Sequence, residues 1–189
     1  MHRLGRSLRL GVLLLGGIVS GSAHEGDPGK ANPDDAKTVD PGHSMHGGAF
    51  NEGPRQHARP MSGMPEIRFD ITTTNAVSRK FFLQGVGQLH GFWYLEAERS
   101  FRESAFHDTN CAMAYWGMAM ANANNATLAA GFIREADRRK ASLTLREKLW
   151  IESLAEFHKD PKRDEKDRRR DYTRALENII FEFPDDVEA

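Results

Sequence analysis

The fold of this chain is decided by the run Gly85-Val-Gly-Gln-Leu-His-Gly-Phe-Trp-Tyr-Leu-Glu-Ala-Glu-Arg-Ser-Phe101. On both sides of Gly91 its apolar residues recur at three- and four-residue steps, which is the period of an amphipathic helix. Gly85 and Ala97 are small enough for paired helices to cross closely, whereas Phe101 is large enough to fill the space between successive pairs. The run therefore predicts helical hairpins that nest side by side.

Helical periodicity continues from this run to the end of the chain. Thr74 or Asn75 is placed to cap the first helix, and the spacing of Thr144 and Glu147 is that of a capping box. The expected helices cover about residues 75–91, 94–107, 112–123, 127–142, 144–160 and 164–183. Short connections join them into antiparallel pairs, and no Gly-rich phosphate loop or strand–helix alternation is present. We therefore expect residues 65–189 to form one all-α domain.

The spacing of large and small residues matches the tetratricopeptide pattern, which repeats about every 34 residues. The residues expected to set the repeat packing are Phe81, Gly85, Ala97, Phe101, Tyr115 and Ala119. The first four follow the pattern through one helix pair, and the last two stand one repeat length after the first two. Such fixed registers favour stacked pairs, a short solenoid, over an ordinary helical bundle, which has the same helical period.

The match to the pattern is incomplete. Gln84 and Gln88 stand where the pattern has leucine and tyrosine, and Thr109 replaces a proline. In the fourth helix Gly131 and Glu135 replace alanine and phenylalanine, so the second repeat is divergent or longer.

Together with Cys111-Ala-Met-Ala-Tyr-Trp-Gly-Met-Ala119, the quoted run resembles a family of exported bacterial tetratricopeptide-repeat proteins, over about residues 65–189. The resemblance implies a helical solenoid and little about ligands. Members of the family are longer than this chain, and residues 185–189 are typical of the start of another helix, so we expect an N-terminal fragment. If the chain ends at Ala189, the open apolar face of the last pair predicts a homo-oligomer.

The N-terminus has the three parts of a secretory signal peptide. Arginines at positions 3, 6 and 9 precede the apolar run 11–19, and Gly21-Ser22-Ala23 offers a cleavage site. The apolar run is shorter than the roughly 20 residues of a membrane span, although an uncleaved anchor is the alternative. We expect residues 1–23 to be removed and the mature protein to be periplasmic or secreted, without a membrane span.

Removal of residues 1–23 takes away three arginines and no acids, so the formal net charge changes from −1 to −4. A mildly acidic chain does not suit nucleic acid as a partner. Cys111 is the only cysteine, so an internal disulfide is excluded and packing must stabilise the domain.

Residues 24–64 are predicted to form a disordered tether, because they contain seven glycines and five prolines and only one aromatic residue. Beyond them, Ile67, Phe69 and Ile71 alternate with polar residues, which suits a short extended segment lying on a helical surface. The candidate metal ligands of the tether are His43, Met45, His46, His57, Met61 and Met64. Thioether and imidazole groups suit copper, but the composition equally fits a solvated linker without metal.

Other candidate residues have a structural interpretation beside a functional one. His90 is either a ligand or catalytic residue or, as we expect, packed and hydrogen-bonded to a neighbouring helix. Cys111 is expected to be buried and inert. The helical aromatics, which would otherwise form a binding groove, are expected in the core: Trp93, Tyr94, Tyr115, Trp116 and Trp150.

No nucleophile, base and orienting group can be assembled from local spacing. The sequence therefore predicts a non-catalytic scaffold that binds a protein or peptide partner, without a cofactor. The alternative is a copper- or metal-handling protein that uses the tether. A third hypothesis is an activity carried by a further C-terminal part.

The copper hypothesis predicts saturable binding of Cu(I) to residues 24–64, tighter than micromolar, because several thioether and imidazole groups lie in one flexible segment. Titration of that segment with Cu(I) under anaerobic conditions measures it. A linear, non-saturating titration would exclude metal handling by the tether.

Overall fold

The computed structural model describes residues 53–54 and 56–189. The predicted signal peptide, most of the tether and the candidate ligands His43, Met45 and His46 lie outside the described residues. In the described part all regular secondary structure is helical, as predicted. The elements are α1 (Ala76–His90), α2 (Tyr94–His107), α3 (Ala112–Ala121), α4 (Ala126–Arg138), the short 3₁₀ turn η3 (Lys140–Ser142), α5 (Leu145–Lys159) and α6 (Glu165–Glu182).

The starts of α1 and α5 are fixed by local side-chain hydrogen bonds. The side chain of Asn75 accepts from the main-chain N–H groups of Val77 and Ser78 at the start of α1. Thr144 and Glu147 form the predicted capping box at the start of α5. Each cap satisfies donors that a helix start would otherwise leave unpaired, which is why the sequence located these boundaries closely.

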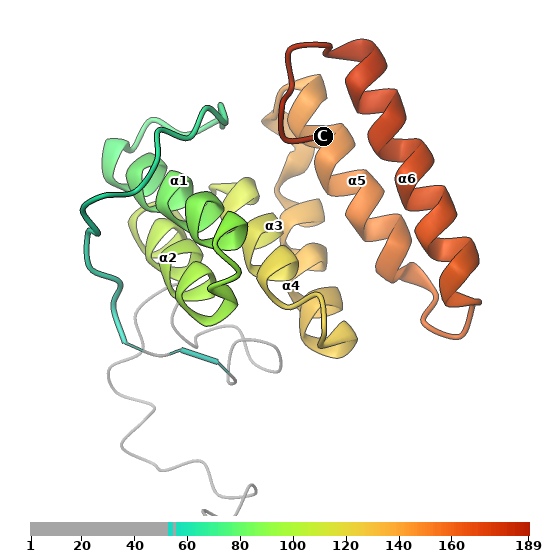
Figure 1. Ribbon diagram of the computed structural model, residues 1–189, viewed down its shortest axis with the longest axis horizontal. Coiled ribbons are helices and arrows are strands. Elements are labelled where there is room, and N and C mark those ends of the chain that lie inside the picture. Colours follow the sequence, from blue (N-terminus) through green and yellow to red (C-terminus); the bar gives the residue numbers. More distant parts are fainter. Residues whose placement is uncertain (1–52, 55) are drawn as a thin grey trace, which may run out of the picture.

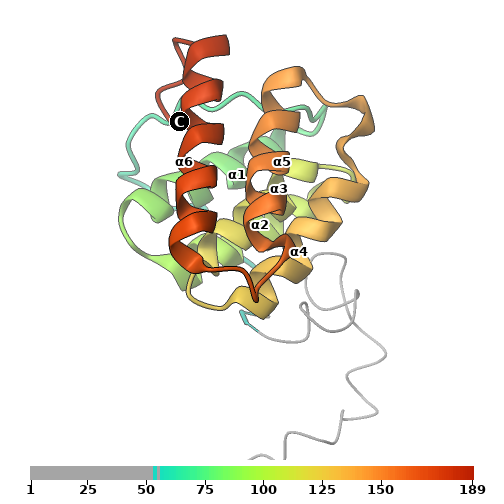
Figure 2. The ribbon, with the colours of Figure 1, turned by 90° about the vertical axis from the view of Figure 1, so that its right-hand side faces the viewer.

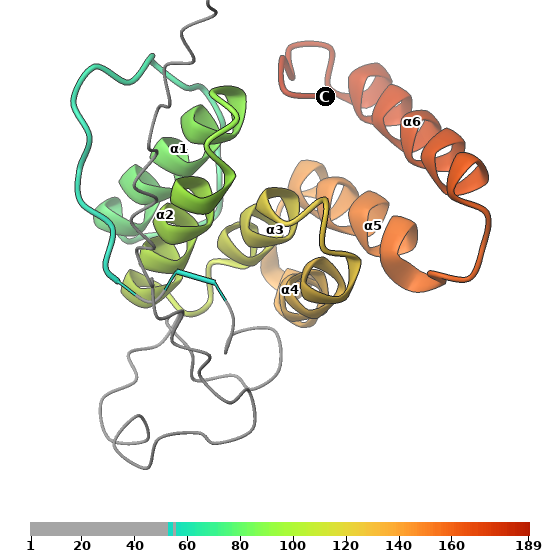
Figure 3. The same ribbon diagram turned by 60° about the horizontal axis from the view of Figure 1, so that its bottom comes forward.

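Consecutive helices pack in pairs, α1 with α2, α3 with α4 and α5 with α6 (Figure 1). The second helix of each pair also packs against the first helix of the next, and α3 contacts both α1 and α5. Figure 3 shows the three pairs following one another in chain order. The first helices, α1, α3 and α5, thus lie in sequence along one side, which we call the inner face. This packing is consistent with helical repeats.

Phe101 of α2 lies where the first pair meets the second. A Cβ atom built on Gly85 of α1 would be 2.6 Å from Phe101 Cε1, and one built on Gly117 of α3 would be closer still. The ring is fully buried, as is Ala97 one turn before it. Both helices next to this ring must therefore lack a side chain at the point of contact. Gly117 was not identified from the sequence, which pointed to the nearby and equally buried Ala119.

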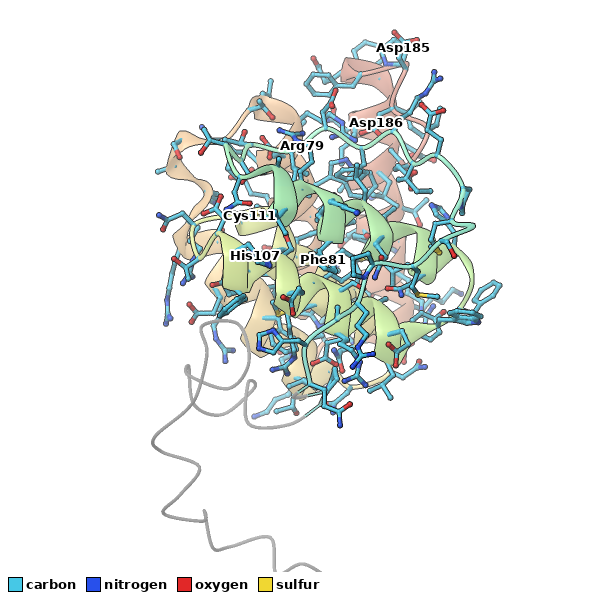
Figure 4. All side chains as sticks on the ribbon, turned by 90° about the vertical axis from the view of Figure 1, so that its left-hand side faces the viewer. Arg79, Phe81, His107, Cys111, Asp185 and Asp186 are labelled. Carbon is cyan, nitrogen blue, oxygen red and sulfur yellow. The ribbon has the colours of Figure 1, made fainter. Side chains whose placement is uncertain are left out.

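The first-helix aromatics of the first two pairs make related contacts within their own pair. Phe81 of α1 stacks on His107 at the end of α2, with ring centroids 5.9 Å apart and planes at 3° (Figure 4). Tyr115 of α3 is buried under the guanidinium of Arg139, 4.2 Å from its ring centroid, just after α4. Phe81 and Tyr115, which the repeat register aligns, thus each contact a residue at the C-terminal end of the second helix of their own pair.

The last helix lies at the outer edge of the stack (Figure 2). On it only Ile179 is fully buried, while Ile180 and Phe181 are exposed among charged residues. In the part of the chain that the structure describes, no helix combines the length and the apolar character needed to cross a membrane.

The substitution Gly117→Ala is expected to lower the free energy of unfolding by about 1–3 kcal/mol, because the new methyl group overlaps the Phe101 ring. Gly91→Ala is the control, since the nearest atom to its added Cβ is 3.5 Å away, and its effect is expected to stay within about 0.5 kcal/mol. Urea unfolding measures both. Equal effects of the two substitutions would show that the Phe101 contact does not limit how closely the pairs approach.

Candidate peptide-binding face

The inner face contains three buried aromatic residues, one from each inner helix. Phe82, Trp116 and Trp150 are separated by 34 residues each, so they occupy equivalent positions in the three pairs. The Trp116 and Trp150 centroids are 5.3 Å apart and the Phe82 and Trp116 centroids 6.5 Å apart. We call these three residues the aromatic ladder. Their spacing equals the repeat length of about 34 residues of the pattern found in the sequence.

The ladder is covered by the chain itself. Phe69, from the extended segment before α1, has its ring centroid 5.3 Å from Phe82, 5.6 Å from Trp116 and 5.8 Å from Trp150. Phe69 and Ile71 are buried and Ile67 is partly buried, while the residues between them are exposed. The predicted alternation is thus confirmed. We call residues 65–73 the inner segment.

Two arginines bind the main chain of the inner segment. Arg79 of α1 donates from Nη2 to the carbonyl oxygens of Ile71 at 2.9 Å and Thr73 at 3.1 Å. Arg146 of α5 donates from Nη1 to the carbonyl of Asp70 at 3.1 Å. Its guanidinium also lies 4.2 Å from the centroid of the Phe69 ring, in a cation–π contact. Arginine suits this role because its planar group offers several donors at once.

Glu147 of α5 binds the other polar groups of the same backbone. Its carboxylate accepts from the N–H and the hydroxyl of Thr72, both at 2.6 Å, while it also completes the α5 capping box with Thr144. The residue is buried, so these donors replace the water that a carboxylate requires. One side chain therefore couples the start of α5 to the inner segment.

The chain after α6 returns to the same region. Asp186 accepts from Arg146 Nε at 2.7 Å and Nη2 at 2.8 Å, and from Trp150 Nε1 at 2.9 Å. Burial alone would raise the pKa of this carboxyl, but the hydrogen bonds from Arg146 and Trp150 outweigh it and hold the pKa below its usual value. Figure 4 shows Arg79 and Asp186 on the side of the molecule over which the inner segment runs.

The indole N–H groups of the two ladder tryptophans differ. Trp150 donates to Asp186, whereas Trp116 Nε1 is buried and has no hydrogen-bond partner in the described part of the chain. An unpaired buried donor costs roughly 1–3 kcal/mol. The inner segment therefore covers the ladder with apolar side chains but offers no hydrogen-bond acceptor to the Trp116 N–H group.

The candidate metal ligands in the described part, His57, Met61 and Met64, each contact a different residue of α1 or α2. His57 Nδ1 lies 2.8 Å from Glu103 Oε2, and the Met61 sulfur accepts from Gln88 Nε2 at 2.9 Å. The methyl group of Met64 lies over Gly87 of α1. Within residues 53–54 and 56–189, no three His, Cys, Asp or Glu side chains are grouped so that they could hold a metal ion.

The disordered tether was predicted to end at Met64, but its last part, residues 56–64, has a defined position on the helices. They lie along α1 and α2, and their main-chain groups bond to the buried side chains of Gln84 and Glu103. These two partners were not recognised from the sequence, where Gln84 was only a departure from the repeat pattern. The signal available in the sequence was a glutamine at a repeat position that is normally apolar, because an amide buried there needs a hydrogen-bond partner.

The remaining candidates divide between core and surface. Cys111 is buried, and burial raises the pKa of its thiol to about 11, so it stays protonated near neutral pH. Tyr115, Trp116 and Trp150 are buried as predicted. Trp93 and Tyr94 are 56% and 41% exposed, so their predicted core position was wrong. They stand where the turn after α1 leads into α2, and their neighbours Phe92 and Leu95 are exposed as well.

The prediction that His90 is packed against a neighbouring helix was wrong, because its side chain is 57% exposed at the end of α1, where it pairs with an acidic residue. Its Nε2 lies 2.9 Å from Glu188 Oε2 in the segment after α6, not on a neighbouring helix.

Comparison with protein-family models, curated proteins and solved structures finds no match to this chain. The repeat interpretation therefore depends on the spacing of the ladder and the packing of the helix pairs.

The ladder offers a matched pair of substitutions, Trp150→Phe and Trp116→Phe. Both replace an indole by a smaller phenyl ring and remove the N–H group, but only Trp150→Phe breaks a hydrogen bond to a buried carboxylate. We expect Trp150→Phe to lower the free energy of unfolding by about 1–3 kcal/mol more than Trp116→Phe. Urea unfolding at neutral pH measures the difference, and equal losses would show that the Asp186 bond contributes nothing.

Proposed function

We propose that this chain is a non-catalytic protein-interaction scaffold of tetratricopeptide type, which acts outside the cytoplasm and binds a protein or peptide partner on its inner face. The single observation that carries the proposal is the way Arg79, Arg146 and Glu147 bond to the main chain of an extended segment. Bonds to main-chain groups hold any extended peptide, whatever its side chains, and the aromatic ladder adds an apolar contact surface for one anchor.

The inner segment indicates the chemistry of the partner. It presents apolar side chains at alternate positions, with an aromatic ring in the middle and a hydroxyl-bearing residue after the last apolar one. A partner held in the same way would be an extended peptide with a central phenylalanine or another aromatic residue, which are frequent interface anchors. The export predicted from residues 1–23 supports a partner outside the cytoplasm.

The repeat type is supported by two independent features. The ladder residues recur at the repeat length, and the ring of Phe101 lies between glycines of two successive first helices. An ordinary bundle needs neither a fixed period nor the same contact side in each pair.

The proposal predicts that a chain whose inner segment has lost its anchor accepts the same segment from outside. In the full chain carrying Phe69→Ala, a labelled peptide of residues 65–73 is expected to bind saturably, as measured by fluorescence anisotropy. A further Arg79→Ala change should weaken binding about tenfold, since it removes two hydrogen bonds to the peptide main chain.

The control peptide has alanine at the position of Phe69 and should bind far more weakly. Loss of the buried ring also costs about 3–5 kcal/mol of stability, so circular dichroism must first show that the variant is folded. If it is not, Phe69→Leu, which keeps most of the volume, takes its place. A folded variant that binds neither peptide would mean that the inner segment is only part of the core.

A further inference from the structure

The chain before the inner segment is held by the helices in a different way. Residues 56–64 lie on α1 and α2, and apart from Ala58 and the partly buried Met64 they are exposed. They contribute little to the apolar core and are attached mainly by polar contacts. We call residues 56–64 the latch.

Gln84 of α1 holds the middle of the latch by both of its polar groups. Its Oε1 accepts from the N–H of Met61 at 2.8 Å, and its Nε2 donates to the carbonyl of Arg59 at 3.0 Å. The same Nε2 lies 3.0 Å from Ser100 Oγ of α2. The amide therefore pairs with the latch main chain as a neighbouring strand would.

Gln88, one turn further along α1, supports this contact. Its Oε1 accepts from Ser100 Oγ at 2.7 Å, and its Nε2 donates to the Met61 sulfur at 2.9 Å. Glu103 of α2 holds the start of the latch, where it accepts from the N–H of Ala58 at 3.0 Å. All three side chains are buried by the latch and by their own helices.

Gln84 and Gln88 stand at the two positions where the repeat pattern has leucine and tyrosine. Each amide shares its hydrogen bonds between Ser100 of α2 and the latch, so both glutamines are fully paired within the protein only while the latch is in place. The departure from the pattern therefore has a specific physical reason. Those two positions have exchanged apolar packing for hydrogen bonds to a segment outside the repeat.

From these contacts, and on the basis of the proposed function, we propose that the latch regulates the peptide site by keeping the chain's own inner segment in it. The inner segment is fixed at one end by α1, which begins at Ala76, and at the other by the latch. Opening the latch frees one end and lowers the effective concentration of the segment at the ladder. An outside peptide then competes with it more successfully.

The polar attachment is suited to opening. Each hydrogen bond at the surface shifts the balance between closed and open states by roughly twofold to tenfold, because water replaces it on opening. Local opening of such a segment needs far less free energy than unfolding of the helices. The unpaired Trp116 N–H adds a second reason for exchange, since an outside peptide that brings an acceptor gains a bond that the inner segment does not make.

The test compares the full wild-type chain with Gln84→Leu, which restores the residue of the repeat pattern and removes the two main-chain bonds to the latch. The labelled peptide of residues 65–73 is expected to bind Gln84→Leu about tenfold more tightly than the wild type. Arg59→Ala is the matched control, because the side chain of Arg59 is exposed and only its carbonyl bonds to Gln84. It should bind the peptide as the wild type does.

Hydrogen exchange of the unmodified wild-type chain gives a second measurement that needs no variant. The amides of Ala58 and Met61 are expected to exchange faster than those of α3, which open only with the whole domain. Exchange of both sets at one common rate would overturn the proposal, as would a folded Gln84→Leu chain with unchanged peptide affinity. If Phe69→Ala binds the peptide and Gln84→Leu shows no gain, only the latch fails; if Phe69→Ala does not bind, the proposed function fails.

Discussion

The arrangement of the domain depends on the contact of one phenylalanine ring with two glycines. Phe101 lies against Gly85 of α1 and Gly117 of α3, and no side chain at either glycine could coexist with the ring in its present place. The contact fixes how closely the first and second pairs approach, because a ring is stiff and cannot yield as a longer aliphatic chain would. Since α5 packs against α4 and also contacts α3, the second pair in turn positions the third. The spacing of the aromatic ladder follows from this geometry.

The ladder in turn explains why the segment before α1 is ordered. Three aromatic residues on neighbouring helices form an apolar surface that would be costly to leave in water. Phe69 covers this surface, and the main-chain bonds to Arg79, Arg146 and Glu147 satisfy the polar groups that its own backbone brings with it. Apolar burial and polar pairing are thus combined on one short extended stretch. The same combination is what a peptide-binding surface requires, so under the proposed function one set of residues would serve both stability of the domain and recognition.

Local features of this structure could be read from the sequence, but only part of the non-local packing could. The helix at Tyr94–His107 and the cap at Thr144 were predicted at the observed positions, because period and capping act within a few residues. The ladder was missed, since the register was aligned on Phe81 and Tyr115, one residue before the members that meet on the inner face. Periodicity alone does not distinguish the two faces of a helix that is buried on both.

The metal-handling and scaffold hypotheses are linked by the residues that they share. Met61 is a candidate metal ligand, and its sulfur is also the acceptor for Gln88 in the latch. His57, another candidate, lies beside Glu103, which holds Ala58. A soft metal ion that recruited Met61 would therefore compete with the bond from Gln88, and metal binding and latch closure would oppose each other. By thermodynamic linkage, a peptide that displaces the inner segment and loosens the latch would favour metal binding to the same extent. If both hypotheses hold, the latch is the place where metal binding and peptide binding would be coupled.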